Sequence, residues 1–368
     1  MYIPIIKNRN QEKKVIRDFQ QYLNDDVVPL FEVIKDDYKE RFQKDPETGK
    51  FVMIMPEDGK RRKKVKLPRR EEDIKTLSVL NEILNGKKAF VEFFRYIDEE
   101  YKGVKVDTNK VDLSFALSRD YNLYKKRMVD IRNFDNLIPT ISIKKGFEFS
   151  KTDLNSIISD LKMNNAPIAI RITDDLFEDY SEQLSRYLTK IDYIMLDVRE
   201  QNIESKIMEL EEFEEFETDA SKILLNSPRS RKRKNGDYEH LQFTDKIDNT
   251  CAINYSSYNF DGFGDFGGLK DTLPSKGGGG GKGCALALMY SKEYNNFFSI
   301  VNYDVDQGLR GYRTVVADLL ENRSLIDLNY DCPIIDEIEE KANEGSYGNW
   351  ENWTYYTLAR YIYQLVVK

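Results

Sequence analysis

The sequence predicts an α/β protein with a TIM-barrel-like (β/α)8 fold, a basic β-hairpin insertion and a C-terminal α+β elaboration. Short runs rich in β-branched and aromatic residues alternate with longer amphipathic stretches. Most of these runs are apolar at both odd and even positions, which is typical of parallel strands buried on both faces. Eight such units favour closure into a barrel, because closure leaves no unpaired strand edge. A doubly wound open sheet is the main alternative.

The expected strands are residues 2–6, 27–34, 89–95, 137–144, 167–172, 191–198, 221–226 and 250–255. Between them, apolar residues recur at three- and four-residue steps beside charged faces, as in residues 10–23, 151–163 and 174–189. These stretches predict crossover helices. Ser150 and Thr173 precede two of them, where a hydroxyl can cap a helix start. The barrel is therefore expected to span residues 1–258.

Two insertions interrupt this rhythm. In residues 50–70, two β-prone segments flank a Pro-Glu-Asp-Gly turn and predict a projecting β-hairpin. Eight of its last eleven residues are Lys or Arg. Such a run is either a solvated strand edge or a docking site for nucleic acid or an acidic partner. The candidate contacts are Lys60, Arg61, Arg62, Lys63, Lys64, Arg69 and Arg70. The second insertion, residues 226–249, carries another basic run and is expected to be a polar, mobile loop.

Residues 259–368 are expected to cap and complete the barrel. A glycine- and aromatic-rich loop over residues 260–271 leads to five consecutive glycines, 277–281. This run fails to match a phosphate-binding P-loop, because Gly281 and Lys282 are followed by Gly283. Strands are expected over residues 284–290 and 297–303, and helices over 312–321, 334–342 and 349–366. Aromatic residues along the last helix predict packing against the barrel.

Composition restricts the class of protein. The net charge is −8 and 40% of the 368 residues are hydrophobic, which predicts a folded, soluble chain and argues against a general nucleic-acid coat. The three cysteines lie far apart, as in a reduced, cytoplasmic protein. No apolar run reaches the ~18 residues that a membrane helix needs. We therefore expect a cytoplasmic protein that does not contact a membrane.

Candidate site residues lie near the ends of the expected strands, where (β/α)8 barrels place their reactive groups. Glu32 and Asp197 are embedded in apolar runs, where an ionised carboxylate needs a partner. Lys7, Arg95 and Arg171 are cations at other strand ends. Together they predict either buried salt bridges or a site for acid–base chemistry or a phosphate ester.

Metal chemistry has little support in the sequence. His240 is the only histidine, which excludes His-rich metal sites and His-dependent triads. An oxygen-only Mg²⁺ or Mn²⁺ site stays open, built from Glu32, Glu92, Asp197 and Asp265. The sequence therefore identifies no particular cofactor, and Mg²⁺ or Mn²⁺ is the one metal class that it leaves open.

Several loose motifs occur in an order that resembles the beta protein family, named after a gene in a satellite-phage operon. They are the Tyr-Ile-Pro-Ile-Ile-Lys start at residues 2–7, Pro-Leu-Phe-Glu at 29–32, Phe-Gly-Asp-Phe-Gly-Gly-Leu-Lys-Asp at 263–271, Gly-Tyr at 311–312 and Trp-Glu-Asn-Trp at 350–353. The resemblance covers nearly the whole chain. It implies a barrel protein of prophages, satellites and defence islands, acting with a partner from the same operon. It also adds Asp265 to the candidate catalytic residues and Lys270 and Asp271 to the ligand-binding residues.

Three functions remain open from the sequence. The first is a component of an antiphage defence or phage-conflict operon that acts with a partner protein and binds a phosphorylated or nucleotide-like ligand at its mouth. The second is a phosphoester hydrolase or lyase that uses carboxylates at the strand ends. The third is nucleic-acid binding through the basic loops, which the acidic net charge disfavours.

Overall fold

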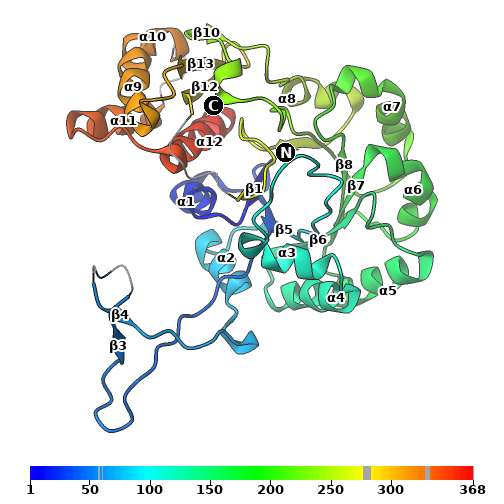
Figure 1. Ribbon diagram of the computed structural model, residues 1–368. Coiled ribbons are helices and arrows are strands. Elements are labelled where there is room, and N and C mark those ends of the chain that lie inside the picture. Colours follow the sequence, from blue (N-terminus) through cyan, green and yellow to red (C-terminus); the bar gives the residue numbers. More distant parts are fainter. Residues whose placement is uncertain (57–58, 60, 277–282, 328–331, 368) are drawn as a thin grey trace.

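The computed structural model describes residues 1–368 except 57–58, 60, 277–282, 328–331 and 368. Within the described chain, eight parallel strands close into a barrel in the order β1-β11-β9-β8-β7-β6-β5-β2, which confirms the predicted fold class (Figure 1). The first seven barrel strands in the sequence agree with the predicted runs. The barrel strands are β1 (Tyr2–Lys7), β2 (Leu30–Val33), β5 (Ala89–Phe93), β6 (Leu137–Ile143), β7 (Ala169–Thr173), β8 (Tyr193–Asp197), β9 (Ser221–Leu225) and β11 (Gly262–Asp265).

Helices cover the outside of the barrel, because each presents one apolar face. In α5 (Lys151–Leu161), the residues Leu154, Ile157, Ile158 and Leu161 are buried at helical spacing. The Ser150 hydroxyl caps this helix by accepting a hydrogen bond from the Asp153 backbone N–H at 3.1 Å. These helices are α1 (Asn10–Asp18), α2 (Thr76–Leu84), α3 (Asp112–Leu117), α4 (Tyr121–Asp130), α5 (Lys151–Leu161), α6 (Phe177–Ser185), α7 (Ile207–Glu215) and α8 (Cys251–Asn254). Across the described residues, no helix combines the length and apolarity needed to span a bilayer.

The predicted eighth strand is wrong. Residues 250–255 form α8 and the start of a 3₁₀ turn, and the last barrel strand is β11, inside the expected glycine-rich loop. The Asp248 carboxylate accepts a hydrogen bond from the Thr250 backbone N–H at 3.0 Å and opens the helical segment. The barrel strands therefore extend beyond residue 258, and the closing strand lies in the part of the chain that was expected to cap and complete the barrel with loops and helices.

Two glycines explain why β11 does not look like a strand. Gly262 and Gly264 face the barrel interior, where a Cβ on Gly264 would lie 2.6 Å from the Ile3 carbonyl oxygen and 2.6 Å from a Leu225 methyl. A side chain at either position would push β11 away from β1 and β9, to which it is hydrogen-bonded. Closure of the barrel thus requires glycines in β11, and these glycines lower the strand propensity of the segment.

We expect Gly264→Ala to lower the free energy of unfolding by about 3 kcal/mol, because the added methyl meets backbone and cannot be accommodated by a rotamer change. Gly86→Ala is the control. Gly86 has a φ of +83° and open space around its Cβ position, so the alanine costs only about 1 kcal/mol of backbone strain. Urea denaturation measures both losses. Equal losses in the two variants would show that closure does not depend on the missing side chain.

The C-terminal elaboration is an antiparallel sheet covered by helices. Its strands have the order β10 (Gln242–Phe243), β13 (Asn296–Asn302), β12 (Ala285–Ser291). Helices α9 (Tyr312–Glu321), α10 (Arg323–Ile326), α11 (Pro333–Asn343) and α12 (Trp350–Val366) follow. The two longer strands and α9, α11 and α12 agree with the predicted segments. Helix α12 packs against both β12 and α1, so it joins the elaboration to the barrel.

The basic insertion projects from the barrel as a thin ribbon, which we call the arm and define as residues 38–70 (Figure 1). Strands β3 (Met53–Ile54) and β4 (Lys63–Lys64) pair in antiparallel fashion, as predicted, but over only two residues each. Bridges between Phe42 and Lys66 and between Lys44 and Phe51 extend the ribbon towards the barrel. The insertion is thus a hairpin with a third segment beside it.

Candidate functional site

Charged side chains occupy the last inward-facing position of several barrel strands. Alternate strand residues, among them Ile5, Leu30, Phe90, Ala169 and Met195, form a separate apolar cluster that fills the barrel interior. Two residues further along each strand, the same face carries Lys7, Glu32, Glu92, Arg171 and Asp197. Because side chains alternate with a period of two, these five groups form one polar layer at the C-terminal mouth. All are buried.

Arg171 is the centre of this layer. Its Nε and Nη2 donate to Asp197 Oδ2 at 2.9 and 2.7 Å, and its Nη1 donates to Glu32 Oε1 at 2.7 Å and to Glu92 Oε2 at 2.8 Å. Burial alone would lower the pKa of the guanidinium, but Asp197, Glu92 and Glu32 together raise it well above its ordinary value. Arg171 is therefore a permanent cation that holds three carboxylates in place.

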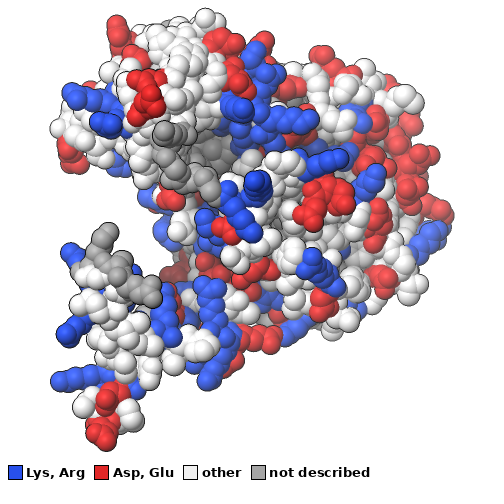
Figure 2. All heavy atoms as spheres, in the orientation of Figure 1, with Lys and Arg blue, Asp and Glu red and all other residues white. Residues whose placement is uncertain are grey.

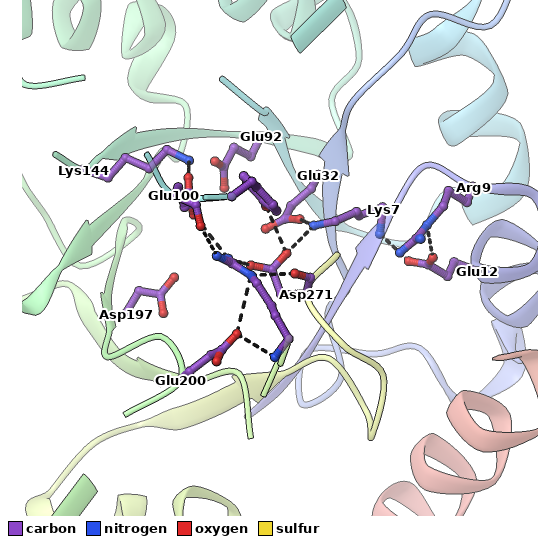
Figure 3. Close-up of polar contacts among 12 residues, drawn as sticks. Lys7, Arg9, Glu12, Glu32, Glu92, Glu100, Lys144, Asp197, Glu200 and Asp271 are labelled. Carbon is purple, nitrogen blue, oxygen red and sulfur yellow. Dashed lines mark hydrogen bonds and ion pairs between the residues drawn. The ribbon is translucent and has the colours of Figure 1, made fainter. Parts of the chain in front are cut away.

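Lys7 is the second buried cation. Its Nζ pairs with Glu32 and lies 2.6 Å from Asp271 Oδ1 (Figure 3). Burial favours the neutral amine, but the two carboxylates outweigh it and raise the pKa of Lys7. The pKa of Glu32 is lowered, because Lys7 and Arg171 overcome the effect of burial. A lysine held in this state is a charged hydrogen-bond donor and cannot serve as a free amine nucleophile.

Loop residues extend the network above the strands. Arg231, from the loop after β9, pairs with Asp271, and its Nη1 donates to the Glu100 carbonyl oxygen at 2.8 Å. Lys144 Nζ lies 2.6 Å from Glu100 Oε2 (Figure 3). Burial would raise the pKa of Asp271, yet Lys7 and Arg231 hold it below its usual range. These contacts join the loops after β5 and β9 to the segment after β11.

A cavity of about 630 Å³ opens at this mouth. Its volume is within the range of small-molecule sites. Acidic side chains outnumber basic ones in its lining: Glu32, Glu92, Glu99, Glu100, Glu148, Asp197 and Asp271 against Lys144, Lys145, Arg171 and Arg199. The wall therefore favours ligands that present cationic or hydrogen-bond-donating groups.

Glu92 differs from the other buried carboxylates of the layer. Both oxygens of Glu32, Asp197 and Asp271 accept hydrogen bonds from protein groups. Glu92 Oε2 is held by Arg171, whereas its Oε1 accepts no hydrogen bond from any residue that the structure describes. Since Glu92 also lines the cavity, this oxygen is available to a ligand.

The structure brings together five of the predicted site residues, which are Lys7, Glu32, Arg171, Asp197 and Asp271. Glu92 was recognised in the sequence only as a strand-end carboxylate and as a metal ligand. Glu100 and Arg231 were missed as site residues, because no pattern in a loop reveals which strand end it crosses. Arg231 belongs to the insertion that was expected to be a mobile loop.

Three predicted site residues lie outside this cavity. Asp265 has the opposite parity to Gly264 and points outward, where Tyr361 and Tyr2 donate to it at 2.6 and 3.2 Å. Arg95 also points outward, and its guanidinium lies 4.3 Å from the Tyr124 ring centre. Lys270 contacts the carbonyl oxygens of Arg231 and Arg233, and burial, followed by the charge of Arg229, lowers its pKa to about 8.

The remaining predicted groups have no part in the mouth. Arg61, Arg62, Lys63, Lys64, Arg69 and Arg70 are exposed on the arm, while Lys60, the five glycines and Lys282 lie outside the described residues. Among described residues, no three carboxylate, histidine or cysteine side chains are arranged to hold a metal ion. The carboxylates of the predicted Mg²⁺ or Mn²⁺ site instead bind Arg171 or, for Asp265, two tyrosines.

Comparison with known proteins gives no family. No protein-family model matches the chain, and no curated protein has a significantly similar sequence. The resemblance to the beta protein family therefore stays a prediction, and the site must be interpreted from its own geometry.

Proposed function

We propose that the protein is a barrel enzyme that binds a small hydrophilic molecule in the mouth cavity and moves a proton to or from it through Glu92. The observation that carries this proposal is that Glu92 lines the cavity, that Arg171 fixes its Oε2, and that its Oε1 accepts no hydrogen bond from a described residue. A carboxylate with one anchored and one available oxygen is positioned for general acid–base work. Buried ion pairs add little to stability, so a layer of this kind has more value in orienting a reactive group.

The lining indicates the class of ligand. Arg171 already donates to three carboxylates, so its guanidinium cannot grip a phosphate in the bidentate manner without releasing them. Hydroxyl and amino groups, in contrast, can donate to Glu92. We therefore favour a polyol or amine, and a phosphorylated or nucleotide-like molecule fits only with its phosphate at the rim beside Lys145.

The experiment is a metabolite pull-down with the intact protein, followed by calorimetry on whatever is retained. We expect Glu92→Gln to weaken binding about 10- to 100-fold, since a charged hydrogen bond contributes roughly 1.5–3 kcal/mol. The amide keeps the size of the side chain and an acceptor for Arg171. Glu148→Gln, at the exposed rim, is the matched control and should change affinity less than threefold. A ligand that binds wild type and Glu92→Gln with equal affinity would contradict the role proposed for Glu92. Retention of a phosphate ester would show that the ligand is not a simple polyol or amine.

The setting that we propose is the one implied by the sequence resemblance, an antiphage defence or phage-conflict operon whose second product binds this chain. The arm is the feature that favours a binding partner, because none of its described residues belongs to the barrel core. Co-expression with the adjacent open reading frame, with and without the arm, tests this. Co-purification that requires the arm supports the setting, and a neighbour that never binds contradicts it.

A further inference from the structure

The arm and helices α6 and α7 carry opposite charge at opposite sides of the molecule. The arm has twelve Lys or Arg against five Asp or Glu, although the whole chain has a net charge of −8. Over residues 204–219, eight side chains are acidic and one is basic. Figure 2 shows the acidic side chains gathered along the edge formed by α6 and α7, far from the arm. One molecule cannot bring the two surfaces together.

Ion pairs among the described residues neutralise only part of the charge on each surface. Arg61 and Arg62 on the arm form no ion pair with a described residue. Glu211 and Glu215 on α7 also form none with the described residues. Glu212 lies between the helices, where partial burial, followed by Glu178 and Glu209, raises its pKa. Like charges therefore crowd on α6 and α7, and a cationic partner would relieve their repulsion.

Both surfaces also expose large apolar side chains. On the arm, Met53, Ile54 and Met55 are 46%, 52% and 59% exposed. At the start of α7, Ile207 and Met208 are 49% and 81% exposed, beside the glutamates. A nucleic acid would match the cations of the arm but would leave its apolar residues in water. A protein surface that combines glutamates with apolar side chains matches both, and this chain has one.

We propose that the arm of one molecule docks on the α6–α7 edge of a second copy of the same chain. The contact joins two different surfaces, so it is heterologous and builds a ring or an open filament rather than a closed two-fold dimer. This inference is independent of the mouth cavity. Assembly would place several mouths in one particle, and the self-association would depend strongly on salt because the charged groups are exposed.

Sedimentation analysis of the full chain at 50 mM and 500 mM NaCl tests the proposal. We expect mass to increase with protein concentration at low salt and to fall to that of the monomer at high salt. The arm variant Arg61→Glu/Arg62→Glu and the edge variant Glu211→Lys/Glu215→Lys should each weaken association more than tenfold. Lys87→Glu/Lys151→Glu makes the same charge change as the arm variant at exposed sites elsewhere and should leave association unchanged.

Mixing the two reversed variants provides the decisive step. The arm variant keeps an intact edge and the edge variant keeps an intact arm, and the reversed arm of the first also matches the reversed edge of the second, so an equimolar mixture should recover the association that neither variant shows alone. A chain that carries all four substitutions should regain self-association, because both charges are reversed together. Wild type that stays monomeric at low salt, or arm-dependent binding to a DNA duplex or RNA hairpin without self-association, would overturn the proposal.

Discussion

Replacing Arg171 with methionine is expected to lower the free energy of unfolding by about 4 kcal/mol, the largest effect of any single substitution in the mouth. The guanidinium makes four hydrogen bonds to Glu32, Glu92 and Asp197, all of which are buried. Methionine fills much of the volume but leaves three carboxylates near one another without their common counter-ion. Buried charges that lose their partner are strongly destabilising.

Chemical denaturation at neutral pH measures this loss. Arg186→Met is the control, since Arg186 pairs with Glu182 on the exposed surface of α6 and the pair is screened by solvent. It should change the free energy of unfolding by less than about 0.5 kcal/mol. A chain that combines Arg171→Met with Glu32→Gln, Glu92→Gln and Asp197→Asn should recover most of the lost stability, because it removes the unpaired charges as well. A loss below 1 kcal/mol in Arg171→Met would show that the carboxylates do not depend on Arg171.

The sequence predicts the barrel because strands that are buried on both faces are apolar at consecutive positions. This pattern is visible in the sequence alone. The same pattern fails at β11, where Gly262 and Gly264 are required by the closeness of β1 and β9. That closeness belongs to the closed barrel and cannot be inferred from the local segment. The eighth strand was therefore predicted at residues 250–255 and not at β11, where two of the four residues are glycines.

The site could be predicted in part for a related reason. Alternation along each strand identifies Lys7, Glu32, Arg171 and Asp197 as inward groups at the strand ends. It also places Arg95 on the outer face, and applying this parity test to the sequence would have separated it from the cavity. Asp265 could not be separated in this way, because β11 was expected to be a loop. Glu100 and Arg231 lie on loops, and loop direction depends on tertiary packing that no local pattern contains.

Asp265 offers the second large effect, on the pH dependence of stability. Burial raises the pKa of its carboxyl to about 6 despite hydrogen bonds from Tyr361, the Gly267 backbone N–H and Tyr2, against an ordinary value of 3.8. The folded chain therefore keeps this proton at pH values where the unfolded chain has lost it. The resulting stabilisation is complete below about pH 4, declines as the pH rises to about 6, and is absent above that. The difference corresponds to about 3 kcal/mol at 1.36 kcal/mol per pKa unit.

Asp265→Asn should remove this decline, because the amide does not titrate. Urea denaturation at intervals from pH 4 to pH 7.5 should show wild type losing about 3 kcal/mol relative to the variant over this window. Asp271 and Glu32 do not obscure the effect, since their pKa values are lowered and their stabilisation is lost only at more acid pH. Asp219→Asn, at an exposed position, should leave the wild-type decline in place. Parallel curves for wild type and Asp265→Asn would mean that the carboxyl is already ionised at pH 4. In that case the tyrosine hydroxyls, rather than burial, would determine its charge.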